Sequence, residues 1–302
     1  MADYLTFQNI YEAVMLSIGD AQYSRAVEVK AVVNMIYLNE VCQCDDLYPL
    51  FWLLVFDDEK KSKAPVTNIT AITKATPPVV TAVAHGLVTG DIVTMYDVVG
   101  MTELEKRTVH ITRVTADTFS LQDLDKVNLA GAGYGAAGTG GKAHHRGTLL
   151  TSCRRILDAN WHGYAHMTPI SPAQIANEPS WLDVSTSTPT RRFHRKIFTA
   201  AGVQNDYLLW YPAAASALDL NVQYEKQPAR LSATGDVPLG PPQVGDAIVA
   251  GSVMRLGVNA VQVEAGVIWP AVYKVNLDAI RSLNRQWWED VKSSERSKMF
   301  LL

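Results

Sequence analysis

A sharp change in sequence pattern near residue 66 constrains the fold of this chain of 302 residues more than any other feature. Before it, and again towards the C-terminus, apolar residues recur at the three- and four-residue spacing of amphipathic helices. Between these parts the chain is rich in Thr, Val and Gly, and its short alternating runs are typical of strands. We therefore predict an all-β domain, residues 66–143, inserted between two parts of a second domain, residues 1–65 and 144–302.

Two helices are predicted in the N-terminal part. Thr6 can cap the first, which runs to about Ile18 and stops at Gly19-Asp20. The second spans about Ser24–Cys42 and is apolar on almost every side over Ala26–Leu38. A helix with so little polar surface is expected to be covered on more than one face, either as a central helix or by a neighbouring subunit.

The segment that follows changes from apolar to charged. Leu47–Phe56 is strongly apolar, and Pro49 favours a buried extended or short helical piece over a long helix. Asp57–Lys63 is charged and is expected to form a solvated linker. Its acidic residues, like Asp45 and Asp46, are expected at the surface rather than in a catalytic site.

Short alternating runs separated by turn residues fill the predicted insert. Turn chemistry stands at His85-Gly86 and at Thr89–Asp91, and Ala116-Asp117 is expected to form a tight hairpin. The predicted strands are Asn68–Thr73, Val79–Val83, Asp91–Met95, Arg107–Thr112 and Thr118–Leu121.

The C-terminal part begins with two further alternating runs, Tyr207–Tyr211 and Leu218–Tyr224, and the small residues between them favour a hairpin. Three prolines between Gly235 and Pro242 then exclude regular structure. Apolar residues return at helical spacing over Val244–Leu256, and a last long helix is expected to begin near Pro270. The fold class is therefore α+β: a helical bundle with a β-hairpin subdomain, plus an inserted all-β domain.

Composition narrows the function classes. A formal charge of −3 argues against a nucleic-acid binder held by phosphate neutralisation. The N-terminus lacks the basic region of a signal peptide, and no run of 18 apolar residues occurs, so no membrane span is expected. Three cysteines, with Cys42 and Cys44 one residue apart, do not suggest a disulfide framework and fit synthesis in a reducing cytoplasm.

The glycine-rich run Gly131–Lys142 invites comparison with a phosphate-binding loop. That motif needs glycine and then Ser or Thr where Ala136 and Ala143 stand. The run is therefore predicted to be a flexible loop, and no cofactor is expected.

Metal and nucleophile candidates fail on similar grounds. Cys153, His162 and His166 have ligand-like spacing, with His144 and His145 just upstream, but a helix that would bring the last two ligands together is interrupted by glycine. No nucleophile elbow occurs. The basic run over residues 191–196 alternates like a strand, so its Arg191, Arg192, His194, Arg195 and Lys196 are expected to face solvent or a partner.

Most of the insert resembles a small β module that recurs in phage structural proteins. The module is named after the first catalytic-cysteine half-domain (FCCH) of the ubiquitin-activating enzyme. The residues that carry the resemblance are Ala84–Leu87, Thr89–Asp91, Gly100–Leu104 and Asp117–Leu121. The insert contains no cysteine, so no ubiquitin chemistry is implied.

The rest of the chain resembles the head–tail adaptor (connector) proteins of tailed bacteriophages. The order of its motifs carries this resemblance: two N-terminal helices, Tyr48–Trp52, Cys153–Leu157, Pro169–Pro172, Thr188–Phe193, Leu209–Pro212, Leu220–Pro228, Asp236–Pro238 and two closing helices. The resemblance implies a homo-oligomeric ring, commonly of twelve copies, in the virion neck between the portal protein and tail or nozzle proteins. Viral DNA would pass through its channel without sequence-specific binding, and no enzyme activity is expected.

The same resemblance implies contact residues. Neighbouring subunits are expected to meet at Val29, Val33 and Ile36 of the second helix and at Tyr211, Leu218, Leu220 and Tyr224 of the hairpin. The apolar C-terminus, Met299, Phe300, Leu301 and Leu302, is expected to dock on the portal.

Two alternatives stay open. In the first alternative, the chain is a tail-tube, tail-completion or baseplate component, because such proteins share the β module. In the second alternative, the chain is an adhesin that binds host glycan through the insert, with Tyr96 and Tyr134 as stacking groups.

Overall fold

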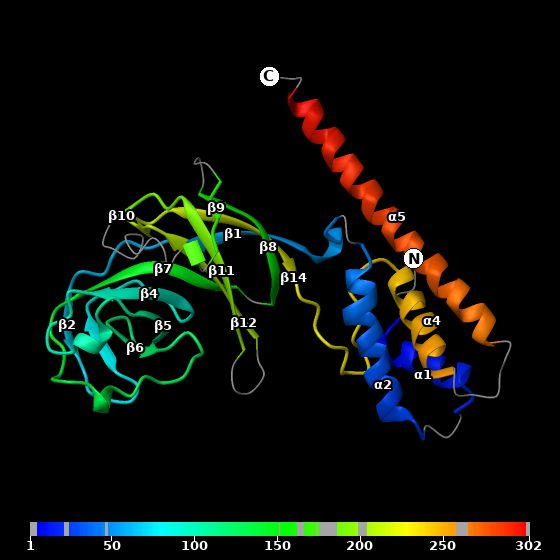
Figure 1. The fold of residues 1–302 in the computed structure, drawn as a ribbon, viewed down its shortest axis with the longest axis horizontal. Coiled ribbons are helices and arrows are strands. Elements are labelled where there is room, and N and C mark those ends of the chain that lie inside the picture. Colours follow the sequence, from blue (N-terminus) through cyan, green and yellow to red (C-terminus); the bar gives the residue numbers. More distant parts are fainter. Residues whose placement is uncertain are drawn as a thin grey trace. The chain divides into compact units, whose positions relative to one another are not determined.

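Two units make up the chain in the computed structural model, which describes residues 5–20, 24–45, 48–150, 152–161, 166–171, 173–174, 186–198, 204–257 and 265–299. The helical unit comprises Met1–Leu54 and Gln227–Leu302, and the β unit comprises Val55–Lys226 (Figure 1). The β unit is thus inserted between two parts of the helical unit. The described residues form four α-helices and a mostly antiparallel β structure, which confirms a mixed α+β class.

Helix α1 (Phe7–Ser17) forms as predicted. The Thr6 hydroxyl accepts the Asn9 N–H at 3.3 Å, and the Asn9 side-chain oxygen accepts the Thr6 N–H. The first turn therefore has a capping box. The helix ends before Gly19, whose φ of +76° suits a residue without a Cβ.

Helix α2 (Ala26–Met35) continues through a π-helical turn (Ile36–Glu40) and a 3₁₀ turn (Val41–Gln43), so a helical path covers the predicted range. Only one face of this path is covered within the chain. Val29 is buried, whereas Val27 on the opposite face is 85% exposed. The sequence pattern predicted burial of this helix on more than one face, but the chain itself does not provide it.

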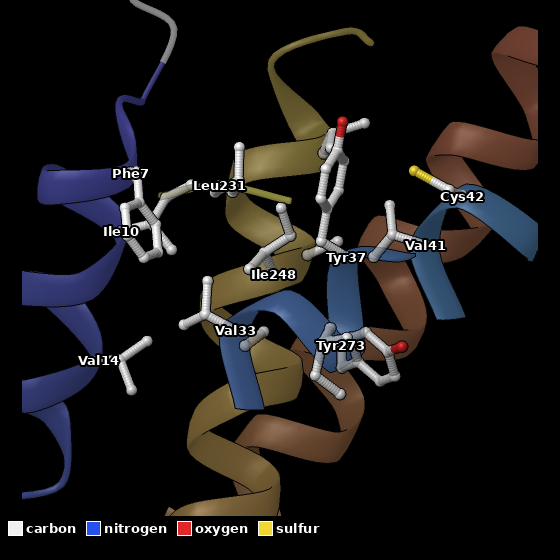
Figure 2. Close-up of a cluster of buried hydrophobic side chains, with 14 of the residues drawn as sticks. Phe7, Ile10, Val14, Val33, Tyr37, Val41, Cys42, Leu231, Ile248 and Tyr273 are labelled. Atoms are coloured by element: carbon white, nitrogen blue, oxygen red, sulfur yellow. The ribbon is translucent and has the colours of Figure 1, made fainter. Parts of the chain in front are cut away.

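Helices α4 (Gln243–Gly257) and α5 (Ala265–Met299) close the helical unit after the proline-rich segment, which is irregular as predicted. Helix α4 packs against α1, α2 and α5 around one apolar core (Figure 2). Helix α5 begins five residues before Pro270, because Trp269 already packs on this core. Within the described chain, no helix is both long and apolar enough to cross a membrane.

The charged segment predicted to be a linker is instead a strand. A 3₁₀ turn (Phe51–Leu53) leads into β1 (Leu54–Lys61), which joins β14 (Asp219–Lys226) and β8 (Cys153–Trp161) in a three-stranded sheet. Lys61 forms an ion pair with Asp219 on β14 at 2.9 Å. The prediction was wrong because a charged sequence indicates that side chains are solvated but does not exclude a strand at the edge of a sheet.

All five predicted strands of the insert form, and they belong to a nine-stranded sheet in the order β2-β3-β6-β5-β4-β7-β12-β11-β9. Bridges from Val66 to Ala143 and from Ile72 to Gly138 join the β2 end back to the β7 end. The first six strands therefore close into a barrel around their own apolar core. These strands are β2 (Ile69–Ile72), β3 (Val79–Ala82), β4 (Asp91–Tyr96), β5 (Thr108–Arg113), β6 (Thr118–Gln122) and β7 (Lys142–Leu150).

Strand β7 crosses the predicted boundary at residue 143. Residues 142–148 pair with β4 in the barrel, and residues 147–150 pair with β12 (Gln204–Tyr211). The sheet then continues through β11 (Arg191–Phe198) to β9 (Thr168–Pro169). The barrel and the remaining strands thus share one continuous sheet.

The predicted hairpin between the runs at 207–211 and 218–224 is wrong. Both runs are strands, but β12 pairs with β11 and β7, whereas β14 pairs with β8 and β1. After β12, Ala213-Ala214 form β13, which pairs in parallel with β10 (Thr186–Ser187). Alternation identifies a strand and its two faces but not its hydrogen-bonding partner.

The glycine-rich run is not predominantly a free loop. Gly131 lies so close to Ala75 that a Cβ would come within 2.3 Å of the Ala75 carbonyl oxygen. Residues farther along the run make the bridges Ile72–Gly138 and Val99–Thr139. Here glycine permits close backbone approach rather than chain freedom.

Candidate functional site

Helix α5 has a buried apolar inner face and further apolar side chains that stay exposed. The inner face, with Tyr273 and Ile280, is buried in the core of the helical unit. At about 100° per residue, Ile268 and Val275 lie on the far side of the helix, and Val272 and Leu283 lie on its flank. This outer stripe consists of Ile268 (59% exposed), Val272 (37%), Val275 (66%) and Leu283 (38%).

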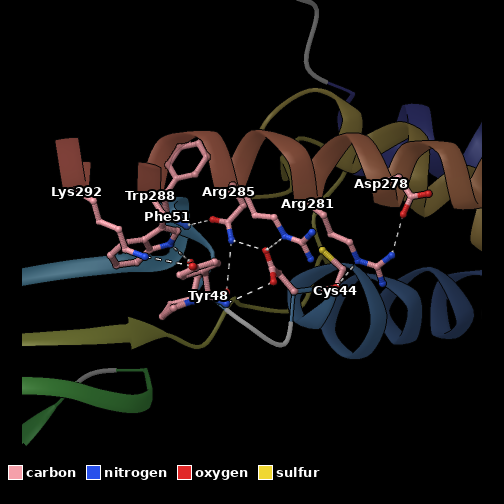
Figure 3. Close-up of polar contacts among 11 residues, drawn as sticks. Cys44, Tyr48, Phe51, Asp278, Arg281, Arg285, Trp288 and Lys292 are labelled. Atoms are coloured by element: carbon pink, nitrogen blue, oxygen red, sulfur yellow. Dashed lines mark hydrogen bonds and ion pairs between the residues drawn. The ribbon is translucent and has the colours of Figure 1, made fainter. Parts of the chain in front are cut away.

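A buried polar group interrupts the inner face. Asn284 donates to the Asp45 carboxylate at 3.0 Å and accepts the Phe51 backbone N–H at 3.0 Å (Figure 3). Asn284 is fully buried, and so is the Asp45 side chain, which was predicted to lie at the surface. We call Asp45, Asn284 and the Phe51 N–H the polar clasp. Since these groups satisfy one another, the clasp fixes the register of α5 against Asp45 and Phe51.

Aromatic and cationic side chains extend the clasp along α5. Trp288 Nε1 donates to the Pro49 carbonyl at 2.8 Å, and the Trp287 ring stacks on Phe51 with centroids 5.3 Å apart. Lys292 Nζ lies 3.2 Å from the Tyr48 hydroxyl and above the Tyr48 ring. Two helical turns of α5 are thus fastened to the segment that leads into the β unit.

Two arginines line a shallow hollow beside the clasp. Arg281 Nε donates to the Cys44 carbonyl at 2.6 Å, and its guanidinium pairs with Asp278 at 3.0 Å. Arg285 Nε lies 3.7 Å from the Asp45 carboxylate. Both guanidinium groups therefore interact with other groups of the same chain, so these arginines hold α5 in place.

The predicted subunit-contact residues on α2 lie inside this chain's own core. Val29, Val33 and Ile36 each have no exposed area and pack with α1, α4 and α5. Their burial needs no neighbouring copy, so a subunit contact in this conformation must use other side chains. The sequence pattern showed an apolar face but could not show what covers it.

The contact residues predicted on the supposed hairpin are also covered within the β unit. Leu220 and Tyr224 pack between the two sheets, with Leu218 beside them, and Tyr211 belongs to a separate cluster on the other face of the large sheet. Because β12 and β14 lie in different sheets, these residues do not form one projecting hairpin surface.

The predicted portal-docking tail lies at the edge of the described chain. Helix α5 ends at Met299, whose side chain is not among those described. Phe300, Leu301 and Leu302 lie outside the described residues. Their docking role stays a prediction.

The metal-like residues do not come together in the part of the chain that the structure describes. His166 is exposed and lies 2.6 Å from Asp158, whereas Cys153 is buried on β8. Burial, followed by the charge of Asp206, raises the pKa of the Cys153 thiol to about 12. His162 lies outside the described residues. Among those described, no three His, Cys, Asp or Glu side chains form a metal-binding group.

A buried ion pair anchors the start of β4. Lys63 Nζ donates to Asp91 at 2.6 Å, and His145 Nε2 lies 3.4 Å from the other Asp91 oxygen. The Lys63 backbone N–H donates to His145 Nδ1 at 3.0 Å, which places the ring proton on Nε2. Burial acts to raise the pKa of Asp91, but the interactions with His145 and Lys63 and the Val88 N–H outweigh it, so this pKa is lowered.

Two further histidines are buried on the outside of the barrel wall. Neither ring nitrogen of His110 or of His144 has a hydrogen bond of normal geometry within the described chain. Burial lowers the pKa of both residues to about 4. Lys126 adds to the effect at His110, and Arg146 and Lys142 add to it at His144. These histidines are therefore neutral near pH 7.

Several residues predicted to face solvent or a ligand are buried instead. Tyr96 is 1% exposed and its hydroxyl accepts from Arg146 at 2.7 Å, so it cannot stack on a glycan. Tyr134 is half-buried and accepts from Arg107. In the basic strand, Arg192 is buried and donates to two backbone carbonyls, and His194 lies 3.1 Å from Asp206.

Comparison with known proteins supports one part of this architecture. Residues 76–133 match the ubiquitin-activating enzyme E1 FCCH domain family. We call this range the FCCH-like module; it holds β3 to β6 and the turn at Gly131–Gly133. The match confirms the resemblance of this part to the FCCH domain, but it covers well under half of the chain. No curated protein matches the chain significantly.

Proposed function

We propose that this chain is a structural virion protein, a head-to-tail adaptor that forms a ring between the portal and the tail of a tailed phage. The order of elements supports this proposal, since two N-terminal and two C-terminal helices flank a β unit that carries an FCCH-like module. The observation that carries it is the set of exposed apolar side chains in the outer stripe of α5.

The outer stripe of α5 leaves four apolar side chains of one helix between 37% and 66% exposed. The helix has 35 residues and is therefore about 52 Å long. Its inner face is fastened by the core and the polar clasp, so the helix cannot turn its outer stripe inward without breaking both. Cover from another chain is the favourable solution, and a ring of copies supplies such cover at every subunit.

Charge is compatible with a DNA channel. Each chain carries −3, so about twelve copies would carry roughly −36, which opposes tight adhesion of phosphate to the assembly. In this proposal DNA passes through without sequence-specific binding, and the partners are the portal and the tail or nozzle proteins. The chain acts through assembly and has no catalytic role.

Electron microscopy tests this proposal directly. Negative-stain images of the purified chain are expected to show rings with a central channel. A gold label on a tagged copy is expected to lie in the neck of the particle. Tubes, or a label along the tail or at the baseplate, would favour the tail-component alternative and reject the adaptor role.

An attachment role for the FCCH-like module is the second candidate. The neighbouring loops 83–90 and 114–117 leave Val83, Val88 and Val114 exposed by 60%, 46% and 58%. Replacing all three with Ser tests this role with the barrel core intact. Loss of host-cell adsorption with normal particle assembly would favour an adhesin, and normal adsorption would remove that alternative.

A further inference from the structure

Four cationic residues gather at one end of the three-stranded sheet in the β unit. Arg154 and Arg155 lie at the start of β8, and Lys226 ends the neighbouring β14, where it is opposite Cys153. Lys196 of β11 joins them, because its Nζ donates to the Arg154 carbonyl oxygen. Arg154 is half-buried and the other three are exposed. We call Arg154, Arg155, Lys196 and Lys226 the basic patch.

Two buried carboxylates accompany the basic patch. Glu225 is buried and accepts from Arg154 Nη1 at 3.1 Å and from Arg155 Nε at 2.7 Å. Asp206 is also buried, and Gln204 Nε2 donates both to it at 2.7 Å and to the Cys153 carbonyl at 3.3 Å. Four cations with two carboxylates leave a net charge of +2, and the carboxylates are buried while three of the cations are exposed.

Glu225 holds two guanidinium groups side by side. Its contact with Arg155 engages the Nε–H of that guanidinium, which has further N–H donors, and 53% of the Arg155 side chain is exposed. A cation whose position is already fixed loses less conformational freedom when it binds an anion. The arrangement therefore favours a ligand that presents several anionic oxygens in a row.

We infer that the basic patch binds the phosphate backbone of DNA without regard to base sequence. Duplex DNA carries one negative charge per about 1.7 Å of its axis, so neighbouring phosphates can meet neighbouring cations of the patch. The choice of DNA as the anion rests on the proposed function, which brings DNA past every copy of the chain. The formal charge of −3 on the whole chain keeps this contact weak, so DNA can still slide.

Fluorescence anisotropy of a short labelled DNA duplex with the full-length chain tests the patch. The patch variant carries Arg155→Gln and Lys196→Gln, and the control variant carries Lys74→Gln and Arg113→Gln in the barrel. All four positions are exposed, so both variants are expected to keep the wild-type circular dichroism spectrum. Lys226→Gln is a milder third variant that leaves both Glu225 contacts in place.

The wild-type chain is expected to bind two duplexes of unrelated sequence equally, with a Kd of the order of 100 µM or below at physiological salt. The patch variant should bind at least about tenfold more weakly, Lys226→Gln about two- to threefold more weakly, and the control variant within about twofold of the wild type. The dependence of log K on log salt should become shallower by about 1–2 in the patch variant, because its lost cations no longer displace counterions.

Other outcomes overturn the inference and separate it from the adaptor proposal. Equal binding by the patch and control variants would show that scattered cations suffice, and absence of binding by the wild type would reject the site. If polyglutamate displaces the duplex at a lower charge concentration than unlabelled DNA does, the patch serves an acidic protein instead. In each case rings in the microscope would leave the adaptor proposal standing, and patch-dependent binding by a chain that forms no rings would reject the adaptor alone.

Discussion

Asn284 of α5 donates its side-chain amide to the Asp45 carboxylate at 3.0 Å, across 239 positions of sequence. Both side chains are fully buried, and the same Asn284 accepts the Phe51 N–H through its carbonyl oxygen. Buried polar groups contribute little while satisfied and are costly when one partner is lost. The clasp therefore sets which part of α5 lies against the chain that enters the β unit.

Replacing Asn284 with Asp should destabilise the helical unit. The change keeps the shape but replaces a donor with a second carboxylate facing Asp45, and we expect a loss of about 2–4 kcal/mol at pH 7. Urea denaturation followed by the helical circular dichroism signal measures it. Asn276→Asp, on the same helix but only half-buried, is the control and should cost much less. Equal effects of the two changes would remove the special role of the clasp.

The β unit should lose stability as the pH falls from about 6.5 to about 4. His110 and His144 are neutral in the folded state because burial lowers the pKa of both to about 4, whereas the unfolded chain protonates near pH 6.5. Protonation below pH 6.5 therefore favours unfolding, by an order of 3 kcal/mol for each histidine once the pH is below about 4. At His110, Gln122 and Asp91 oppose the shift, as Asp97 does at His144, but burial outweighs them.

Thermal melts across this pH range check the effect. Replacing both histidines with Phe should flatten the dependence of Tm on pH. His166→Gln changes an exposed histidine and should leave the dependence steep. If the double variant keeps the wild-type slope, other groups control acid stability.

Gly147→Ala should destabilise the β unit by about 1–3 kcal/mol, because an added Cβ would lie 2.5 Å from the Leu208 carbonyl oxygen and 2.6 Å from Leu209 Cδ2. The position lies in β7 where the barrel passes into the rest of the sheet. Gly133→Ala is the matched control, since its Cβ would meet nothing within 4 Å, and it should be neutral or slightly stabilising. Comparison of the two melting temperatures decides the point.

The three cysteines should be unreactive in the folded chain. Cys42, Cys44 and Cys153 are all buried, and burial raises the pKa of Cys153 to about 12, so little thiolate meets the reagent. Mass spectrometry after iodoacetamide treatment at pH 8 should show no adducts in buffer and three in urea. Ala217→Cys, at an exposed position, should react under native conditions. Rapid labelling of Cys153 in buffer would show that β8 opens.

Local chemistry predicted much of the secondary structure. Thr6 followed three residues later by Asn9 was enough to start α1, because the capping bonds lie within one turn. Alternation found the strands of the FCCH-like module and also β11, β12 and β14, since the period of a strand is written in its own residues. The prolines before α4 likewise ended regular structure where predicted.

The pairing of strands and the burial of side chains depended on contacts between residues that are distant in the sequence. The runs that become β12 and β14 looked like one hairpin, yet each found its neighbours in a different sheet. Tyr96 looked available for a ligand and Asp45 looked solvated, but Arg146 and Asn284, far away in the sequence, bury and pair with them.

The sequence by itself determined most of the helices and strands, which of their faces are apolar, and that a β-rich part interrupts a helical one, because those properties follow from neighbouring residues. Only the tertiary structure decided which apolar faces the chain covers for itself. Val29, Val33 and Ile36 pack in the core, whereas Leu16, Val27 and the outer stripe of α5 stay exposed. Burial is a property of the surroundings of a side chain, and those surroundings come from segments that the local pattern does not contain.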